Sequence, residues 1–162
     1  MLGEVDDGLN LGLRGFLDVS RLGIAGTALG ISRRSLTLAT EFARHRITFG
    51  RPITSRQAVR LSLAEMAADI YSLQTAIRET CVRFDSGTSI ENEAAMCKLL
   101  GIEAVGRVTD RALRLHGGIG YTEAHRIERL YRDARALWFE EGTMEIQKLI
   151  IGNSVASGRL TF

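Results

Sequence analysis

The sequence has little proline, few aromatic residues and almost no excess charge of either sign. A single proline and an aromatic fraction of 6% argue against a β-sandwich. Lysine and arginine together number 21 against 19 acidic residues, so the formal net charge of +2 provides no broad positive surface for nucleic acid. With 45% hydrophobic and 25% charged residues, the composition excludes general disorder. A chain of 162 residues is long enough for one domain with its own core.

Cysteines and long apolar runs are also scarce. Cys81 and Cys97 have no C-x-x-C spacing, so neither a disulfide framework nor a zinc site is indicated, and a reduced, cytoplasmic protein is expected. Charged residues interrupt every apolar run near the N-terminus, so we expect no targeting segment and no membrane span. Glu41 and His45 share a helix face, but a carboxylate-bridged metal site needs a second such pair, so we expect no metal.

Apolar residues recur at alternating steps of three and four, the spacing of one face of an α-helix. No useful length of sequence alternates with period two, as a strand would. We therefore predict an all-α fold, an antiparallel up-and-down helical bundle that forms a single domain over residues 1–162. The pattern predicts helices over about 10–46, 56–85, from Ser89 to the glycines at 117, 118 and 120, 126–136 and 144–157.

Residues at the predicted helix ends suit those positions. Ser55 and Thr143 are plausible N-caps, and Gly87 is a plausible residue beyond a C-terminus. Glycines inside the first helix, at 23, 26 and 30, lower its intrinsic propensity by roughly 1 kcal/mol each relative to alanine. We expect the close approach of another backbone to compensate for them.

A glycine cluster follows the third predicted helix, within the run His116-Gly117-Gly118-Ile119-Gly120. It is not a dinucleotide fingerprint of the Rossmann type, because no strand precedes it and Glu123 stands where the last glycine belongs. The cluster either simply ends a helix or also exposes backbone N–H groups to a phosphate.

Two charged groups allow two interpretations each. Arg44, Arg46 and Arg51 stand where cations stabilise a helix C-terminus, but guanidinium groups beside an aromatic residue also make a pyrophosphate clamp. Glu140 and Glu141 precede a helix start, which acidic residues favour. A carboxylate beside the preceding apolar run could instead act as a general base, because apolar surroundings disfavour its charged form.

These pieces occur together in one order along the chain. In that order and spacing, the sequence resembles the C-terminal helical domain of the acyl-CoA dehydrogenases over essentially all 162 residues. The matching positions are Arg21, R-x-T-F-G-R-P-I at 46–53, Gln57, L-H-G-G-I-G-Y at 115–121, R-D-A-R at 132–135 and E-G-T-M-E-I-Q at 141–147.

The resemblance implies an FAD-dependent enzyme that introduces an α,β double bond into an acyl-CoA thioester. It implies that electrons pass to an electron-transfer flavoprotein or a similar acceptor. Glu141 matches the catalytic base, which takes the α-proton while a hydride leaves the β-carbon. Some members carry the base just before the arginine of the first helix, where this chain has Ser20, and that serine supports Glu141.

The resemblance also assigns cofactor and substrate positions. Arg21 and Gly142 match substrate-binding positions. Arg114 and Glu145 stand where glutamine is frequent, and a glutamate beside a pyrophosphate would repel it unless it is turned away. The positions that match FAD contacts are Arg46, Thr48, Phe49, Gln57, Arg114, Gly117, Gly118, Thr143 and Glu145.

Members of this family also have an N-terminal helical domain and a middle β-domain, which we expect to be absent here. The resemblance also implies that FAD is shared across the interface of a homo-oligomer, a dimer or a tetramer. Surplus apolar residues also suggest self-association. Two alternatives stay open, a non-catalytic oligomerisation bundle and a relative of the acyl-CoA oxidases. The surplus apolar residues form an apolar tail near the end of the sequence, which consists of Leu149, Ile150, Ile151, Val155 and Leu160.

Overall fold

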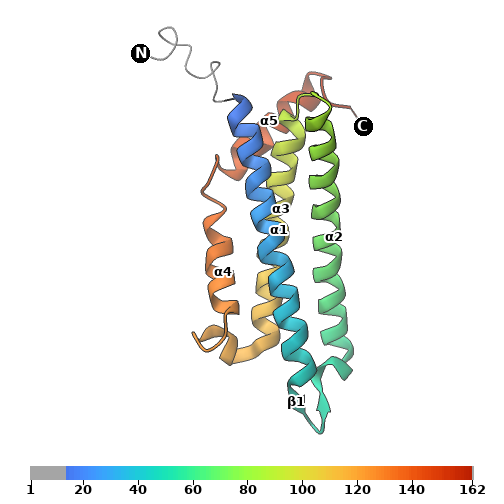
Figure 1. Cartoon of the computed structure of the whole chain (residues 1–162), viewed down its shortest axis with the longest axis vertical. Coiled ribbons are helices and arrows are strands. Elements are labelled where there is room, and N and C mark those ends of the chain that lie inside the picture. The colour runs from blue at the N-terminus through green and yellow to red at the C-terminus, as the bar shows by residue number, and fades with distance from the viewer. Residues whose placement is uncertain (1–13, 162) are drawn as a thin grey trace.

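The structure, a computed structural model, describes residues 14–161 as an antiparallel helical bundle (Figure 1). Helices α1, α2 and α3 run the length of the bundle, and α4 and α5 pack against α3. The all-α prediction is therefore confirmed, while predicted helical positions 10–13 lie outside the described residues. The helices are α1 (Arg14–His45), α2 (Gln57–Asp85), α3 (Glu91–His116), α4 (Ile127–Ala136) and α5 (Met144–Ala156), with short 3-10 turns η2 (Ile53–Ser55) and η3 (Gly117–Tyr121).

Two of the predicted caps are confirmed and one is wrong. Thr143 is the N-cap residue of α5, and Gly87 follows the end of α2 with a φ of +79°. The N-cap of α2 is Arg56 rather than Ser55. Ser55 belongs to η2, where its hydroxyl donates to the Pro52 carbonyl at 2.8 Å, so it closes the preceding turn instead of capping the helix.

A small hairpin, missed from sequence, joins α1 to α2. Its strands β1 (Ile47–Thr48) and β2 (Arg51–Pro52) have two residues each, too few to show an alternating pattern. Phe49 and Gly50 form the connecting turn with φ values of +51° and +74°, as a two-residue hairpin loop requires. The hairpin projects from one end of the bundle (Figure 1).

Helix α3 is the centre of the core and contacts every other helix. Gly101 of α3 lies against Ala25 and Ala28 of α1, and a Cβ at Gly101 would stand 3.2 Å from the Ala25 Cα. This is the close backbone approach that small residues permit. The expectation that glycines 23, 26 and 30 provide such an approach is wrong, because a Cβ at each would meet nothing within 4 Å. All three face outwards.

None of the helices in the described range 14–161 combines the length and apolar character needed to cross a membrane.

Candidate active site

The structure places the predicted site residues at two opposite ends of the bundle. Arg21 and the segment from Glu141 to Glu145 lie at the end where α5 packs on α3 (Figure 1). Arg46, Thr48 and the glycines of η3 lie at the hairpin end. Arg21 and His45, near the two ends of α1, are separated by about 36 Å along the helix at 1.5 Å per residue. One chain therefore presents two distinct surfaces.

Glu141 lies in the segment between α4 and α5 with an unusual backbone conformation. Its φ is +53°, a left-handed value that costs a residue with a Cβ about 1–2 kcal/mol. The residue as a whole is half-buried. In the apolar run before Glu141, Leu137 lies in the core and anchors the segment. Phe139 is 76% exposed, so the run does not enclose the Glu141 side chain. Surrounding contacts must hold this strained conformation in place.

Two fully buried polar side chains hold the backbone around Glu141. The Lys98 ammonium group donates hydrogen bonds to the carbonyls of Glu140 and Gly142. The Gln147 amide nitrogen lies 3.2 Å from the Glu141 carbonyl and 3.4 Å from those of Gly142 and Thr143. Lys98 and Gln147 thus supply donors to the carbonyls of Glu140, Glu141 and Gly142, whereas the Thr143 carbonyl also accepts from the Gln147 backbone N–H at 3.3 Å. The predicted base is therefore carried on a segment tied to α3 and α5.

Arg21 is buried on α1 at the same end of the bundle. Its Nη1 donates to the Asp18 carboxylate at 3.0 Å, while its Nε is buried with no partner among the described residues. Burial raises the pKa of Asp18, and this effect outweighs the opposing influence of Arg21. The positive charge of Arg21 also acts on Lys98. The pKa of Lys98 is lowered mainly by burial and, to a smaller extent, by Arg21.

The residues at the start of α5 interact with one another and with the first turn of that helix. Thr143 and Glu145 are exposed, and Gly142 has a φ of +89°. The pKa of Glu145 is lowered because its own backbone N–H, and then the Thr143 hydroxyl, stabilise the carboxylate. The Glu145 carboxylate is thus engaged by the helix start.

At the hairpin end, Arg46 and Thr48 line a cavity of about 430 Å³ together with Gly117 and Gly118. The two glycines stand about 70 positions after Arg46 in the sequence, and the turn that ends α3 brings them to the same cavity. Gly117 has a φ of +65°, and a Cβ at Gly118 would meet no atom within 4 Å, so the backbone there is open. Apolar walls, a guanidinium group and open glycine backbone suit a nucleotide with its phosphates.

The wall of this cavity includes a stacked aromatic pair. His116 is buried, its ring lies 4.4 Å from that of Phe42, and its Nδ1 is 2.7 Å from the Ala112 carbonyl. Burial lowers the pKa of His116, and the nearby His125 contributes in the same direction. The structure therefore favours a neutral ring that donates from Nδ1 to the carbonyl.

The remaining predicted FAD residues do not line this cavity. Phe49 is 94% exposed at the hairpin tip, with the Arg56 guanidinium 5.1 Å from its ring centre. Gln57 is exposed at the start of α2. Arg114 is exposed and lies 3.7 Å from Asp110, an ordinary surface pair one helical turn away. Within one chain these side chains face outwards.

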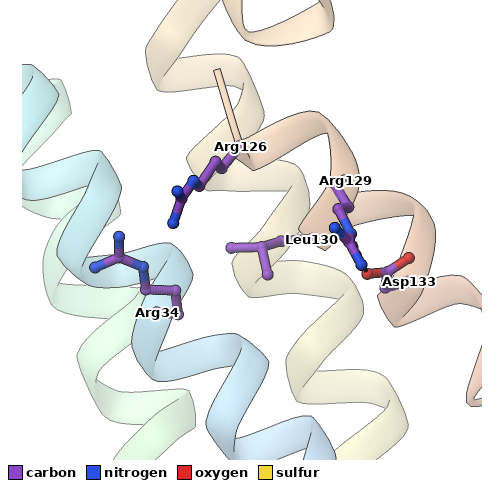
Figure 2. Close-up of a pocket in the computed structure, with 5 residues that line it drawn as sticks. All are labelled: Arg34, Arg126, Arg129, Leu130 and Asp133. Carbon is purple, nitrogen blue, oxygen red and sulfur yellow. Dashed lines mark hydrogen bonds and ion pairs between the residues drawn. The ribbon is translucent and has the colours of Figure 1, made fainter. Parts of the chain in front are cut away.

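Another cavity, of about 520 Å³, lies between α1 and α4 and contains no predicted site residue (Figure 2). Arg34 of α1 and Arg126, the N-cap residue of α4, face it, and Arg129 lies 3.4 Å from Asp133. No cluster of three or more metal-ligating side chains occurs in the part of the chain described.

Sequence reasoning missed Lys98 and Gln147. Lys98 stands three residues after Ala95 and four before Ile102, which places it on the buried stripe of α3. A lone lysine at an apolar position of a helical pattern was the available signal. Gln147 lies inside the E-G-T-M-E-I-Q motif but resembles any polar helix residue in sequence.

The fold and this arrangement define a helical domain that offers a carboxylate at one end and a nucleotide-sized cavity at the other. The family model described as the acyl-CoA dehydrogenase C-terminal domain matches residues 6–156. The chain therefore belongs to the acyl-CoA dehydrogenase family and corresponds to its C-terminal helical domain.

Relatives with known names support this membership. The short-chain specific acyl-CoA dehydrogenase of Bos taurus is 38% identical, over 93% of this chain and 36% of that protein. The 3-(aryl)acrylate reductase of Clostridium sporogenes is 34% identical, over 96% of this chain and 41% of that protein. The butyryl-CoA dehydrogenase structure from Megasphaera elsdenii matches with a TM-score of 0.91 at 30% identity, covering 95% of this chain and 40% of that one. The chain thus spans about two fifths of these relatives' length.

Proposed function

We propose that this chain contributes the catalytic carboxylate of an FAD-dependent acyl-CoA dehydrogenase. The observation that carries the proposal is the backbone of Glu141, a half-buried residue in a left-handed conformation. Lys98 holds its flanking carbonyls, and Gln147 holds its own carbonyl. Strain retained in this way is a common property of functional residues. A surface glutamate that only favoured the α5 N-terminus would need no such support.

In this function Glu141 removes the α-proton of an acyl-CoA thioester, and the resulting carboxylic acid is held at the same place. FAD, when bound, supplies the acceptor for the hydride that leaves the β-carbon. Gly142 keeps the backbone beside the base free of a side chain, and we propose that the substrate passes there. Arg21 supplies a buried positive charge at the same end, with its Nε available for a polar partner.

We propose that the cavity at the hairpin end holds the pyrophosphate and adenosine half of FAD. Arg46 would contact the phosphates, Thr48 would donate a hydroxyl hydrogen bond, and the backbone of Gly117 and Gly118 would approach closely. Phe49, Gln57, Arg114, Thr143 and Glu145 remain proposed contacts. The acyl-CoA dehydrogenase of Bacillus anthracis, 26% identical with a TM-score of 0.88 over 98% of this chain and 31% of that one, has been solved with FAD.

The separation of the two surfaces supports a site shared between copies of the chain. We propose a homodimer or homotetramer in which the hairpin end of one copy and the Glu141 end of another contact the same FAD. Leu149 and Val155 of the apolar tail are 57% and 50% exposed, and such surface is available for contacts. We further propose a cytoplasmic location, supported by the two free cysteines Cys81 and Cys97.

We propose an electron-transfer flavoprotein or a similar protein as the electron acceptor. A relative from Acetobacterium woodii, 32% identical over 93% of this chain and 39% of its own, is named as a subunit of a caffeyl-CoA reductase–Etf complex. Production of peroxide in the presence of oxygen would instead identify an oxidase.

Spectroscopy of the flavin tests the proposed base. With FAD supplied, we expect saturated acyl-CoA thioesters to bleach the flavin absorption of the wild type but not of Glu141→Gln, which should still bind flavin. Glu103→Gln is the control, because this exposed α3 carboxylate lies beside Arg107 and outside the site. Bleaching retained in Glu141→Gln contradicts the assignment, and a wild type that neither binds flavin nor bleaches favours the oligomerisation bundle.

A further inference from the structure

Lys98 is one of only two lysines among 162 residues, and the two have opposite environments. Lys148 is exposed on α5, whereas the side chain of Lys98 has no exposed surface. An ammonium group without hydrogen bonds is strongly disfavoured in a protein interior. The carbonyls of Glu140 and Gly142 accept from two of its three N–H donors. The buried ammonium group of Lys98 therefore needs these carbonyls as acceptors, and both carbonyls use Lys98 as a donor.

The two carbonyls that Lys98 binds stand on either side of Glu141. The Glu140 carbonyl belongs to the peptide bond that precedes Glu141, and the Gly142 carbonyl lies beyond it in the direction of α5. One cation thus fixes both flanks of a residue whose φ is +53°. An apolar side chain of the same size could fill the space, but it would leave the Glu140 carbonyl without its donor and the Gly142 carbonyl with only the Gln147 amide at 3.4 Å.

The helix that carries Lys98 is closely packed. Lys98 stands on α3, the helix that contacts all the others, next to the close approach of Gly101 to Ala25. The charged groups that act on its ammonium group are Arg21 from α1 and the carboxylates of Glu140 and Glu141 from the segment it holds. The two carboxylates favour the charged ammonium, and Arg21 opposes it.

We propose that Lys98 is a positioning residue for the general base, holding the Glu140–Gly142 backbone so that the Glu141 carboxylate stays aimed at the substrate. This proposal rests on the proposed function. Lys98 itself touches neither substrate nor cofactor, and its effect on turnover passes through the backbone on either side of Glu141. A flexible Glu141 would spend little time in a reactive geometry.

Backbone ¹⁵N relaxation of the chain tests the positioning directly. In the wild type we expect order parameters of about 0.85 at Glu141 and Gly142, the value of rigid backbone. In Lys98→Met they should fall below about 0.6 at these two residues while α2 stays rigid. Lys98→Gln, which keeps N–H donors on a shorter side chain, should lie between, and Lys148→Met should match the wild type.

Three outcomes overturn the proposal. They are a wild-type segment that is already flexible, a Lys98→Met segment that is as rigid as before, and a loss of rigidity spread equally over the whole chain. Should Lys98→Met fail to fold, acetylation of the folded wild type remains decisive. Lys148 should be modified readily and Lys98 only on unfolding, and rapid modification of both would refute the burial on which the argument depends.

Turnover of the flavin-loaded enzyme separates positioning from mere structural support. Lys98→Met should lower kcat roughly tenfold to a hundredfold with little change in KM. Lys148→Met should leave both unchanged. If Glu141→Gln abolishes turnover while Lys98→Met leaves kcat unchanged, the positioning proposal alone fails. If Glu141→Gln retains turnover, the proposed function fails, and the relaxation data still report whether Lys98 holds the segment.

Discussion

Alanine substitutions at Gly101 and Gly26 should change stability in opposite directions, although both residues lie inside long helices. Each substitution gains about 1 kcal/mol of intrinsic helix propensity. At Gly26 the new Cβ meets nothing within 4 Å, so the gain should appear almost in full. For a domain of this size, 1 kcal/mol corresponds to a rise in Tm of roughly 2–4 °C.

At Gly101 the new methyl group would stand 3.2 Å from the Ala25 Cα and 3.4 Å from the Ala28 Cβ. The nearest atom is helix backbone, which no change of side-chain rotamer can move, so α1 and α3 must separate. Overpacking of this kind costs about 1–3 kcal/mol, and a backbone neighbour favours the upper half of that range. After the propensity gain, we expect a net loss of about 1–2 kcal/mol.

Urea unfolding followed by circular dichroism measures both variants, at a concentration where size-exclusion chromatography shows the same oligomeric state. We expect the free energies of unfolding to differ by about 2–3 kcal/mol between Gly26→Ala and Gly101→Ala, at equal m-values. Equal stability of the two variants would refute the argument that the α1–α3 contact requires glycine at 101.

Three further predictions concern strain, protonation and an ion pair. Glu141→Gly should raise the free energy of unfolding by about 0.5–1 kcal/mol, because glycine adopts a φ of +53° without strain; a loss of stability in urea would contradict this. Because burial lowers the pKa of His116 in the folded chain, the unfolded chain takes up a proton first as the pH falls. The free energy of unfolding should therefore fall as the pH drops through the ordinary titration range of histidine, near about 6.5, and it should fall less steeply in His116→Gln. Asp69 lies 2.8 Å and 3.4 Å from two arginines of α3, and Asp69→Asn should cost about 1 kcal/mol in thermal melts, a difference that 1 M NaCl should reduce.

The positions of the helices could be predicted from the sequence because the periodicity of a helix and the signals that end it are local properties. The stripe through Leu63, Met66, Ile70 and Leu73 predicted α2 to within a residue at each end. Gly87 and Gly117 marked helix ends because a left-handed φ favours glycine wherever the helix packs. The hairpin at 47–52 escaped prediction because two residues per strand carry no period.

The candidate site was only partly readable from sequence. The motif containing Glu141 named the carboxylate, but Lys98, 43 positions earlier in the chain, had no local feature that linked it to that segment. Its partners are backbone carbonyls, which every residue has, so no side-chain pattern in the sequence could identify the pairing.

The sequence by itself determined the helices and most of their ends, because these depend on residues within a few positions of one another, and the order of motifs along the whole chain singled out Glu141 as the candidate base. The tertiary structure alone decided that Gly101 rather than Gly26 lies at the close contact, that Lys98 holds the backbone around Glu141, and that the two groups of candidate site residues lie at opposite ends. These facts depend on which helix faces meet and in what register, and the packing of whole helices sets that register.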